Sequence, residues 1–290
     1  MKPPPFRYVR AGSLEDALSA LASEGDEARL LAGGQSLIAM MNLRLVRPGA
    51  LVDVNGVSEL DYVRSDDATL TVGALTRLSA AETSQEIAGA CPLMSEAIGH
   101  IAHRPIRNRG TVGGNLAHAD PSSELPAVAL AVDAQMVVQR SGAERRVSAD
   151  EFLVGALTTS MEPDEALTAI EVPRAPAGQG WSFMEVSPRK GDYALVGVAV
   201  TLSVEDGRCT ACRVVYTGNG DRARRIPEAE SAMVGEAAGA ATFAAAGDAA
   251  GGHIEPNSDL HASEQYRRDI ASALTRRALA RAAARCAQEG

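Results

Sequence analysis

Two pairs of adjacent glycines, Gly33-Gly34 and Gly113-Gly114, constrain this chain more than any other feature of its sequence. Glycine lacks a Cβ atom, so it permits a positive φ and a close approach of another backbone or of a ligand. Each pair stands beside hydroxyl and amide side chains, and about 80 residues separate the two. One such pair alone is more often an ordinary tight turn than a ligand site. Two pairs with the same polar flanks favour a cradle in two parts around one large dinucleotide.

The first pair belongs to the segment 31–37, Leu-Ala-Gly-Gly-Gln-Ser-Leu, between an expected strand at 29–32 and an expected helix at 37–45. Successive backbone N–H groups in such a turn form a concave anion site. The N-terminus of a helix adds unpaired donors and the positive end of its dipole. Ser36 offers a hydroxyl to the same anion. The segment therefore predicts a site for a phosphate or a pyrophosphate.

The second pair lies in the segment 110–115, Gly-Thr-Val-Gly-Gly-Asn. Neither glycine segment has the spacing G-x-G-x-x-G of a dinucleotide fingerprint or G-x-x-x-x-G-K-[ST] of a P-loop. A Rossmann-type nicotinamide site and a P-loop are therefore not supported.

The charge and hydropathy of the chain restrict its partners. Its 290 residues include 28 Lys and Arg against 37 Asp and Glu, a net charge of −9. Nucleic-acid binders normally carry a basic face, which this balance does not favour. No apolar run approaches the roughly 20 residues that span a bilayer. The first seven residues lack the apolar segment of a secretory signal. We expect a cytoplasmic protein without a transmembrane segment and without affinity for nucleic acid.

The pattern of elements predicts an α+β chain in two domains, 1–175 and 176–290. Residues 1–57 are expected to form a β–α–β–loop–α–β unit, with Ser13 as the N-cap of its first helix. Residues 58–175 are expected to form a second subdomain, with strands around helices at 79–88, 92–102 and 121–132.

The C-terminal domain is expected to hold a three-stranded antiparallel sheet with helices. The predicted strands are 181–186, 196–204 and 209–216. A long basic helix is predicted at 266–286, with its arginines either on a solvated face or in contact with another subunit.

Of the four cysteines, only Cys209 and Cys212 have the spacing of metal ligands. Residues three apart in a regular strand point to opposite faces of the sheet. A zinc or iron–sulfur site also needs about four ligands, and no second pair follows. We therefore expect both cysteines to be structural and this chain to hold no metal or cluster.

Further segments complete a resemblance to a known family. The chain is similar to the FAD-binding medium subunit of the molybdenum hydroxylases, a family that includes carbon monoxide dehydrogenases and xanthine dehydrogenases. The segments that carry the resemblance are 32–36, 111–115, His118–Pro126, Leu167–Pro173, Arg189–Ala194 and Tyr266–Arg268. The resemblance implies that residues 1–175 form the two-subdomain FAD-binding fold shared with vanillyl-alcohol oxidases, the PCMH type. It also implies that residues 176–290 form the small C-terminal domain of this flavoprotein family.

The resemblance also implies a non-covalently bound FAD, whose pyrophosphate is wrapped by main-chain amides of the two glycine segments. In addition, Glu124 would contact the FAD, Leu167 would lie against its flavin or adenine part, and Tyr193 would shield one face of the isoalloxazine ring. The cofactor-binding residues thus expected are Leu31, Ala32, Gly33, Gly34, Gln35, Ser36, Leu37, Thr111, Gly113, Gly114, Asn115, Glu124, Leu167 and Tyr193.

Some of these positions have ordinary structural alternatives. Glu124 equally suits a solvated acid or a charge at a helix N-terminus, and Tyr193 a partly buried tyrosine. Glu185 departs from the family pattern, because a lysine often occupies this place and would stabilise reduced, anionic flavin. Covalent attachment of the flavin, which some distant relatives use, would involve a histidine, and the candidates are His100, His103 and His118.

The activity implied by the resemblance is electron transfer. A large partner subunit with a molybdopterin cofactor would oxidise the substrate, and two [2Fe–2S] clusters of a small partner subunit would pass the electrons to FAD in this chain. The flavin would reduce an external acceptor, and the complex would be a dimer of heterotrimers. No residue of this chain is expected to act as a catalytic acid or base. The alternatives are a self-contained flavin reductase or oxidase with the same fold, and a non-catalytic binding module in which the glycine pairs are only turns.

Overall fold

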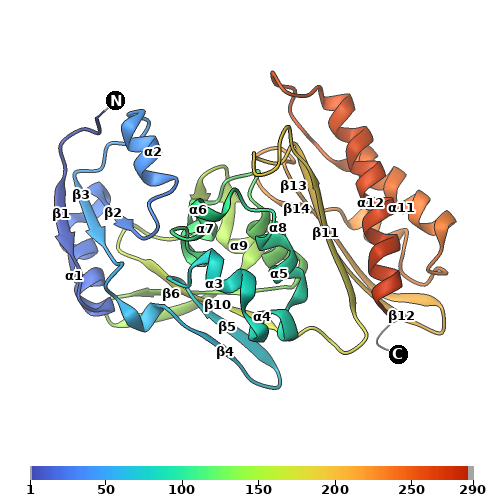
Figure 1. Cartoon of the computed structure of the whole chain (residues 1–290), viewed down its shortest axis with the longest axis horizontal. Helices are drawn as coiled ribbons and strands as arrows, with labels where there is room; N and C mark the ends of the chain where they lie inside the picture. The colour runs from blue at the N-terminus through green and yellow to red at the C-terminus, as the bar shows by residue number, and fades with distance from the viewer. Residues whose placement is uncertain (1, 287–290) are drawn as a thin grey trace.

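The computed structural model describes residues 2–286 and arranges them in three units that follow one another along the molecule (Figure 1). The first unit holds a parallel sheet in the order β1 (Arg7–Arg10), β3 (Ala50–Asp53) and β2 (Ala28–Leu31). Helix α1 (Leu14–Glu24) connects β1 to β2, and helix α2 (Leu37–Asn42) follows β2. This unit has the predicted order of strands and helices.

Local sequence accounts for both helices of the first unit. The hydroxyl of Ser13 accepts a hydrogen bond of 3.1 Å from the backbone N–H of Asp16, so the predicted N-cap of α1 is confirmed. Leu18 and Leu21 bury the inner face of α1. Helix α2 ends three residues earlier than expected, because Arg44 adopts a left-handed φ of 60°. Two short 3₁₀ helices complete the unit, Gly25–Glu27 and Ser58–Leu60.

The second unit is built on a five-stranded antiparallel sheet. Its strands lie in the order β4 (Val63–Ser65), β5 (Thr69–Gly73), β10 (Ala166–Pro173), β6 (Gln135–Arg140) and β7 (Ala143–Ser148). The central strand is the last of the five in the sequence, so the chain returns to close the sheet.

Helices between β5 and β6 cover one face of this sheet (Figure 1). They are α3 (Leu78–Thr83), α4 (Gln85–Ala90), α5 (Pro92–Ile98), α6 (Arg104–Arg107), α7 (Val112–His118) and α8 (Glu124–Ala131). Helix α9 (Ala149–Phe152) and the hairpin of β8 (Leu153–Gly155) and β9 (Thr158–Thr159) follow β7.

All three helices predicted for this unit differ from the prediction. The helix expected at 92–102 ends at Ile98, because residues 99–101 form tighter turns, each N–H donating to the carbonyl three residues earlier. The helix expected at 79–88 is broken at Ser84, whose backbone is extended and whose hydroxyl accepts from the N–H of Ile87 at 3.3 Å to begin α4. The helix expected from residue 121 begins at Glu124, because Ser123 has the extended backbone of an N-cap.

The third unit is an antiparallel sheet covered by helices. Its strands are β11 (Gly180–Val186), β12 (Val196–Glu205) and β13 (Arg208–Thr217), with a short fourth strand β14 (Arg224–Arg225) at the edge. The helices are α10 (Pro227–Ser231), α11 (Ala240–His253) and α12 (Glu264–Cys286). The three predicted strands are present, and the two-residue strand β14 is an addition.

One expectation for this sheet is wrong. Cys209 and Cys212 lie on the same buried face of β13, and their thiols contact each other. The register explains this, since Ala211 pairs with Ser203 while Cys209 pairs with Val204, leaving Thr210 as an extra residue. Such a β-bulge shifts the alternation of side chains by one residue. Within the described residues, no group of three or more His, Cys, Asp or Glu side chains could hold a metal ion.

The C-terminal sheet packs on both faces. One face buries Val198, Val200 and Val214 against α11 and α12, and the other places Phe183 and Ala199 in the core of the second unit. The core is almost entirely aliphatic, in line with an aromatic content of only 3%. No helix among the described residues is long and apolar enough to cross a membrane.

A partly buried ion-pair cluster ties the third unit to the second. Glu96 on α5 pairs with Arg281 and with Arg285, at 2.6 Å for the latter, and accepts from the backbone N–H of Phe183 at 2.9 Å. These two arginines of α12 are thus engaged within the molecule, which neither sequence interpretation of the basic helix expected.

Candidate functional site

The two glycine segments meet, although about 80 residues separate them. A Cβ atom on Gly33 would lie 2.3 Å from the carbonyl oxygen of Arg109 and 2.8 Å from the Cα of Gly110. Real Cβ atoms do not approach other heavy atoms this closely, so the contact requires glycine. The first motif therefore sits directly on the start of the second.

Neighbouring atoms also leave no room for a Cβ atom at the second glycine pair. A Cβ atom on Gly113 would lie 2.4 Å from the Cβ of Ala74, at the end of β5. Thr111, which is buried, accepts a hydrogen bond of 3.0 Å from the N–H of Gly114 and so begins helix α7. Gly113 thus lets α7 pack directly against the residue that follows β5.

The two segments differ in their free hydrogen-bond donors. In the described part of the chain, the backbone N–H groups of residues 33–37 donate to no protein atom. The corresponding groups of residues 112–115 are all paired, with Thr76 O, Ala74 O, Thr111 Oγ1 and Thr111 O. Only the first segment therefore offers a row of amides to an anion. The expectation that amides of both segments wrap a pyrophosphate fits residues 33–37 and does not fit residues 112–115 as they stand.

The side chains of the first segment are consistent with this role. Ser36 is the N-cap of α2 but makes no capping hydrogen bond with its hydroxyl. The amide of Gln35 donates to the carbonyl of Gly33 at 3.0 Å and closes the turn. Leu31, Ala32 and Leu37 are half-buried at the two ends of the segment.

Sequence reasoning missed two residues that hold the segments together. The side-chain amide of Asn55 donates to the carbonyls of Leu31 at 3.2 Å and Ala32 at 2.9 Å. Arg77 donates to Asn55 Oδ1 at 2.7 Å with one nitrogen and to the carbonyl of Arg109 with another. In the sequence Asn55-Gly56 is no more than a turn after a strand, so only the contacts identify it.

Glu124 and Asn115 are brought together beside the second segment. Ser123 links them, since its hydroxyl donates to Asn115 Oδ1 at 2.8 Å and lies 3.5 Å from Glu124 Oε2. Glu124 is the first residue of α8 and is buried. Burial, followed by the negative charge of Glu185, raises the pKa of Glu124 to about 8. The alternative of a solvated carboxylate is therefore wrong.

The other two predicted positions have different surroundings. Leu167 is buried on β10, within the core that also contains Val112 and Leu116 of α7. Tyr193 is 65% exposed on the loop 187–195 between β11 and β12. Desolvation of its hydroxyl, then the nearby negative charges of Asp120 and Glu124, raise the pKa of Tyr193. Tyr193 thus lies on the Glu124 side of the site, while Leu167 lies beneath α7.

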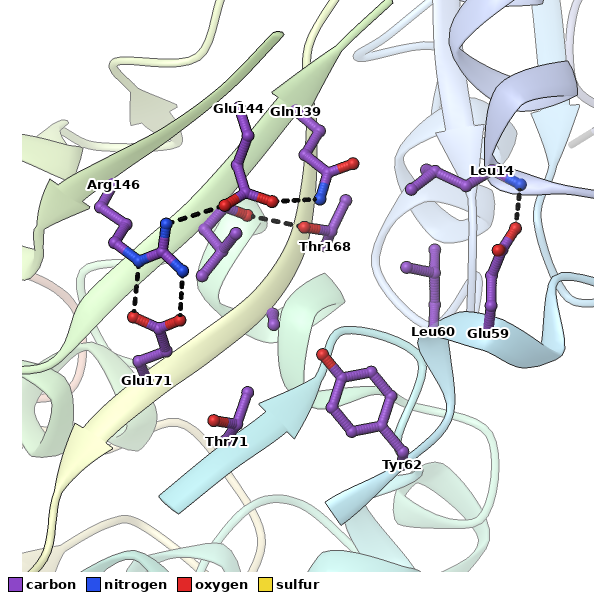
Figure 2. Close-up of a pocket in the computed structure, with 12 residues that line it drawn as sticks. Leu14, Glu59, Leu60, Tyr62, Thr71, Gln139, Glu144, Arg146, Thr168 and Glu171 are labelled. Carbon is purple, nitrogen blue, oxygen red and sulfur yellow. Dashed lines mark hydrogen bonds and ion pairs between the residues drawn. The ribbon is translucent and has the colours of Figure 1, made fainter. Parts of the chain in front are cut away.

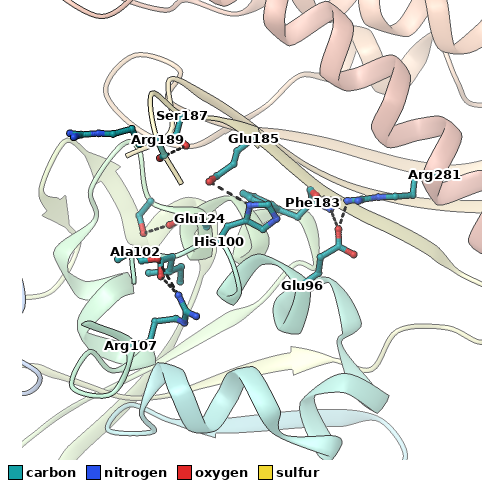
Figure 3. Close-up of polar contacts among 12 residues, drawn as sticks. Glu96, His100, Ala102, Arg107, Glu124, Phe183, Glu185, Ser187, Arg189 and Arg281 are labelled. Atoms are coloured by element: carbon teal, nitrogen blue, oxygen red, sulfur yellow. Dashed lines mark hydrogen bonds and ion pairs between the residues drawn. The ribbon is translucent and has the colours of Figure 1, made fainter. Parts of the chain in front are cut away.

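Glu185 occupies the seam between the second and third units. Its side chain points toward His100, with 3.4 Å between Glu185 Oε1 and His100 Nδ1 (Figure 3). The His100 ring also packs edge-on against Phe183, at 5.2 Å between ring centroids. A carboxylate at this position places negative charge where the resemblance often has a lysine.

A separate groove lies on the opposite face of the five-stranded sheet, with a volume of about 210 Å³ (Figure 2). None of the predicted site residues lines it. Arg146 pairs there with Glu144 and Glu171, each at 2.8 Å, and Gln139 donates to Glu144 at 2.7 Å. Its charged groups are engaged with one another or, for Glu59, with the backbone N–H of Leu14, so we assign the groove a structural role.

Comparisons with known proteins agree with this geometry. Residues 4–175 match the family described as FAD binding domain in molybdopterin dehydrogenase, and residues 181–282 match the CO dehydrogenase flavoprotein C-terminal domain. The 6-hydroxypseudooxynicotine dehydrogenase complex subunit alpha of Paenarthrobacter nicotinovorans is 44% identical over 97% of this chain and 96% of its own length.

Solved structures show the same likeness. Carbon monoxide dehydrogenase from Hydrogenophaga pseudoflava superposes with a TM-score of 0.96 at 37% identity, over 99% of this chain and 100% of that chain. Quinoline 2-oxidoreductase from Pseudomonas putida 86 superposes with a TM-score of 0.94 at 39% identity, over 98% and 99%. The likeness extends over nearly the whole chain and is not confined to the glycine segments.

Proposed function

Because this chain belongs to the family of FAD-binding medium subunits of molybdenum hydroxylases, we propose that it relays electrons between two partners. It accepts them from [2Fe–2S] clusters of a small partner subunit and delivers them through non-covalent FAD to an external acceptor. A large partner subunit with a molybdopterin cofactor oxidises the substrate. The assembly is a cytoplasmic dimer of heterotrimers, and the boundary between the two domains of this chain lies near residue 175.

One observation supports the cofactor assignment above all others. Five consecutive N–H groups, those of residues 33–37, lack protein partners in the described chain and lie where Gly33 contacts the start of the second motif. Unpaired amides at a turn and a helix start are the donors that a pyrophosphate needs. They also explain how a chain of net charge −9 holds an anionic cofactor. The amides that touch the anion do the binding, and the net charge of the chain does not.

The residues present fit FAD, and we assign a role to each segment. Residues 33–37 bind the pyrophosphate, and Thr111 to Asn115 form the second wall of the cradle. We expect Glu124 and Tyr193 to lie beside the flavin ring, and Leu167 belongs to the core cluster that also contains Val112 and Leu116 of α7. FAD itself supplies the redox chemistry, while the protein supplies binding, orientation and electrostatics.

The test is a gentle affinity purification of this chain from its native host, followed by absorbance spectroscopy, metal analysis and mass spectrometry. We expect a flavin spectrum together with iron, molybdenum, one small partner and one large partner. Flavin without partners or metals, combined with turnover of a small substrate, would favour the self-contained flavoenzyme instead. A colourless chain that does not take up added FAD would overturn the proposal.

A separate measurement tests whether the flavin is bound without a covalent bond. Acid precipitation of the coloured protein should release all the flavin into the supernatant, since no covalent bond holds it. Flavin that stays with the pellet and with a histidine-containing peptide would contradict non-covalent binding.

A further inference from the structure

The loop 187–195 between β11 and β12, which carries Tyr193, rests on the second unit at Gly191. A Cβ atom on Gly191 would lie 3.0 Å from the carbonyl oxygen of Ala102 and 2.5 Å from the ring of His103, the residue before α6. Gly191 also has a φ of 86°, which residues with a Cβ atom rarely adopt. Both the close approach and the backbone conformation require glycine, so the loop meets the segment 101–103 at a defined place.

The other end of the loop is held by the third unit. The N–H of Leu195 donates to the carbonyl of Val186 at 2.8 Å and closes the base of the loop. The carbonyl of Leu195 accepts from the guanidinium of Arg267, which is buried on α12. Tyr193 therefore lies midway along the chain between two held residues, Gly191 and Leu195.

Arg107 of α6 holds the segment on which Gly191 rests. Its side chain is only 10% exposed, and its Nη1 donates to the carbonyls of Ile101 at 2.8 Å and Ala102 at 3.1 Å (Figure 3). Its other nitrogens, Nε and Nη2, donate to the two carboxylate oxygens of Glu82 on α3, each at 3.0 Å. Such a two-point pair fixes the direction and the plane of the guanidinium. The carbonyl of Ala102 is therefore bound to Arg107 and also forms the contact with Gly191.

The backbone of Ala102 shows why this segment needs support. Ala102 has a φ of 45°, in the left-handed region that is unfavourable for a residue with a Cβ atom. Such a conformation persists only where the surrounding structure enforces it. Arg107 binds the carbonyls of both peptide groups that flank the Cα of Ala102. Loss of the guanidinium would free the segment to leave this conformation, and the carbonyl that meets Gly191 would move with it.

We propose that Arg107 is a positioning residue for the flavin site. It fixes the segment 101–103, this segment holds the loop 187–195 through Gly191, and the loop keeps Tyr193 beside the flavin ring. This rests on the proposed function, because Tyr193 has a ring to cover only when FAD is bound. Arg107 acts through the loop, and its contribution is the position of the tyrosine.

The first test follows the loop in the purified full chain without FAD. Trypsin cuts after Arg189 and Lys190, which are exposed in the loop, and each cut requires the loop to open. The rate of cutting reports the population of the open loop. Arg107→Gln should raise the rate at these two bonds about tenfold, because the open loop becomes about tenfold more populated. Mass spectrometry of the new chain ends identifies the bonds that are cut.

Arg145→Gln is the matched control for the loss of a paired arginine. Arg145 on β7 donates to both carboxylate oxygens of Glu165, at 2.8 and 2.7 Å, and to the carbonyl of Ser160 at 2.8 Å. The variant therefore removes the same kind of pair from the same unit without touching the segment 101–103. It should leave the rate of the loop cuts within about twofold of wild type.

Gly191→Val tests the same contact from the side of the loop. It puts a branched side chain at a φ of 86° and against the carbonyl of Ala102, so the loop has to move away. The cut after Arg189 should again be about tenfold faster, once its rate is divided by the rate in a peptide of residues 185–197 with the same sequence. The variant leaves Arg107 and Glu82 in place, so it tests the proposal even if Arg107→Gln fails to fold. Far-UV circular dichroism checks the fold of each variant.

The FAD-loaded chain gives the link to the flavin. A tyrosine ring in contact with a flavin ring quenches its fluorescence by transferring an electron to the excited flavin. Arg107→Gln and Tyr193→Leu should each raise the flavin fluorescence roughly threefold, and the double variant should be no brighter than Tyr193→Leu, because two residues that act through one contact are not additive. A double variant that is brighter than Tyr193→Leu would show that Arg107 does not act through Tyr193.

A wild-type cutting rate in Arg107→Gln or in Gly191→Val would overturn the positioning role, and so would an equal acceleration in Arg145→Gln. The trypsin experiment uses the chain without FAD and without partners. Its outcome is therefore independent of whether this chain binds FAD or receives electrons from a cluster subunit, and the two proposals fail separately.

Discussion

Arg77 donates a hydrogen bond of 2.7 Å to the side-chain oxygen of Asn55, and this contact sets the spacing between the two glycine segments. Asn55 holds the carbonyls of Leu31 and Ala32, and Arg77 also holds the carbonyl of Arg109. The pair thus links the end of β2 to the start of the second motif through hydrogen bonds. Neither residue is among the expected cofactor ligands, so their role is to position the segments that are.

We expect Arg77→Ala to weaken FAD binding by roughly 10- to 100-fold, because a hydrogen bond to a charged group contributes about 1.5–3 kcal/mol. The measurement is the Kd for FAD from the quenching of flavin fluorescence. Arg174→Ala is the matched control, since Arg174 makes its hydrogen bonds with Ser65 and Asp66 at the far end of β10. Equal affinities of the two variants for FAD would show that the contact between Arg77 and Asn55 does not support FAD binding.

Gly33→Ala should abolish FAD binding. Its Cβ would lie 2.3 Å from the carbonyl oxygen of Arg109, and that atom belongs to a backbone that Arg77 holds in place. The two segments would have to separate. Gly252→Ala is the control, because a Cβ there meets no atom within 4 Å and lies in helix α11, where alanine is favoured by up to about 1 kcal/mol. A Gly33→Ala protein that binds FAD with wild-type affinity would show that the segments need not touch.

Glu124 should make the stability of the FAD-free chain depend on pH. Its pKa is about 8 in the folded chain and 4.5 as the ordinary value, so between these values the folded state holds a proton that the unfolded state has lost. The free energy of unfolding then falls as pH rises, by about 1.4 kcal/mol per pH unit. The contribution is complete below pH 4.5 and lost above pH 8.

Glu124→Gln removes this dependence. Urea unfolding at intervals from pH 5 to pH 9 should show the stability of Glu124→Gln rising relative to wild type by ~4 kcal/mol across the window. Glu205→Gln, on an exposed carboxylate at the end of β12, should run parallel to wild type. A constant difference between Glu124→Gln and wild type would contradict the raised pKa.

Glu96→Ala should destabilise the chain by about 2 kcal/mol, because it leaves Arg281 and Arg285 without the partly buried carboxylate that they share. Urea unfolding at pH 7 measures the loss. Glu264→Ala breaks the pair with Arg268 at the exposed start of α12 and should cost less than about 1 kcal/mol. Similar losses in both variants would mean that Glu96 does not join the two units.

Local features of the fold were readable from the sequence where short-range chemistry decides them. Ser13 begins α1 because its hydroxyl caps an amide three residues away, and the strands of the C-terminal sheet follow from their residue pattern. Breaks in this regularity were not readable. The expected helix at 79–88 is broken at Ser84, and the bulge at Thr210 turns Cys209 toward Cys212, because pairing with β12 sets the register of β13.

The same division applies to the candidate site. The glycine pairs and their polar flanks predicted a cradle from the sequence alone, because the absence of a Cβ atom is a property of the residue itself. Which amides stay free was decided by tertiary contacts, since Ala74 and Thr76 occupy the donors of the second segment and nothing described occupies those of the first. The positions of Asn55, Arg77 and Glu185 depend on strands and helices far apart in the chain. The sequence by itself determined the fold family and the loops expected to approach the cofactor. Burial and long-range hydrogen bonds arise only when the chain packs, and they decided which residues hold these loops in place and which charges surround them.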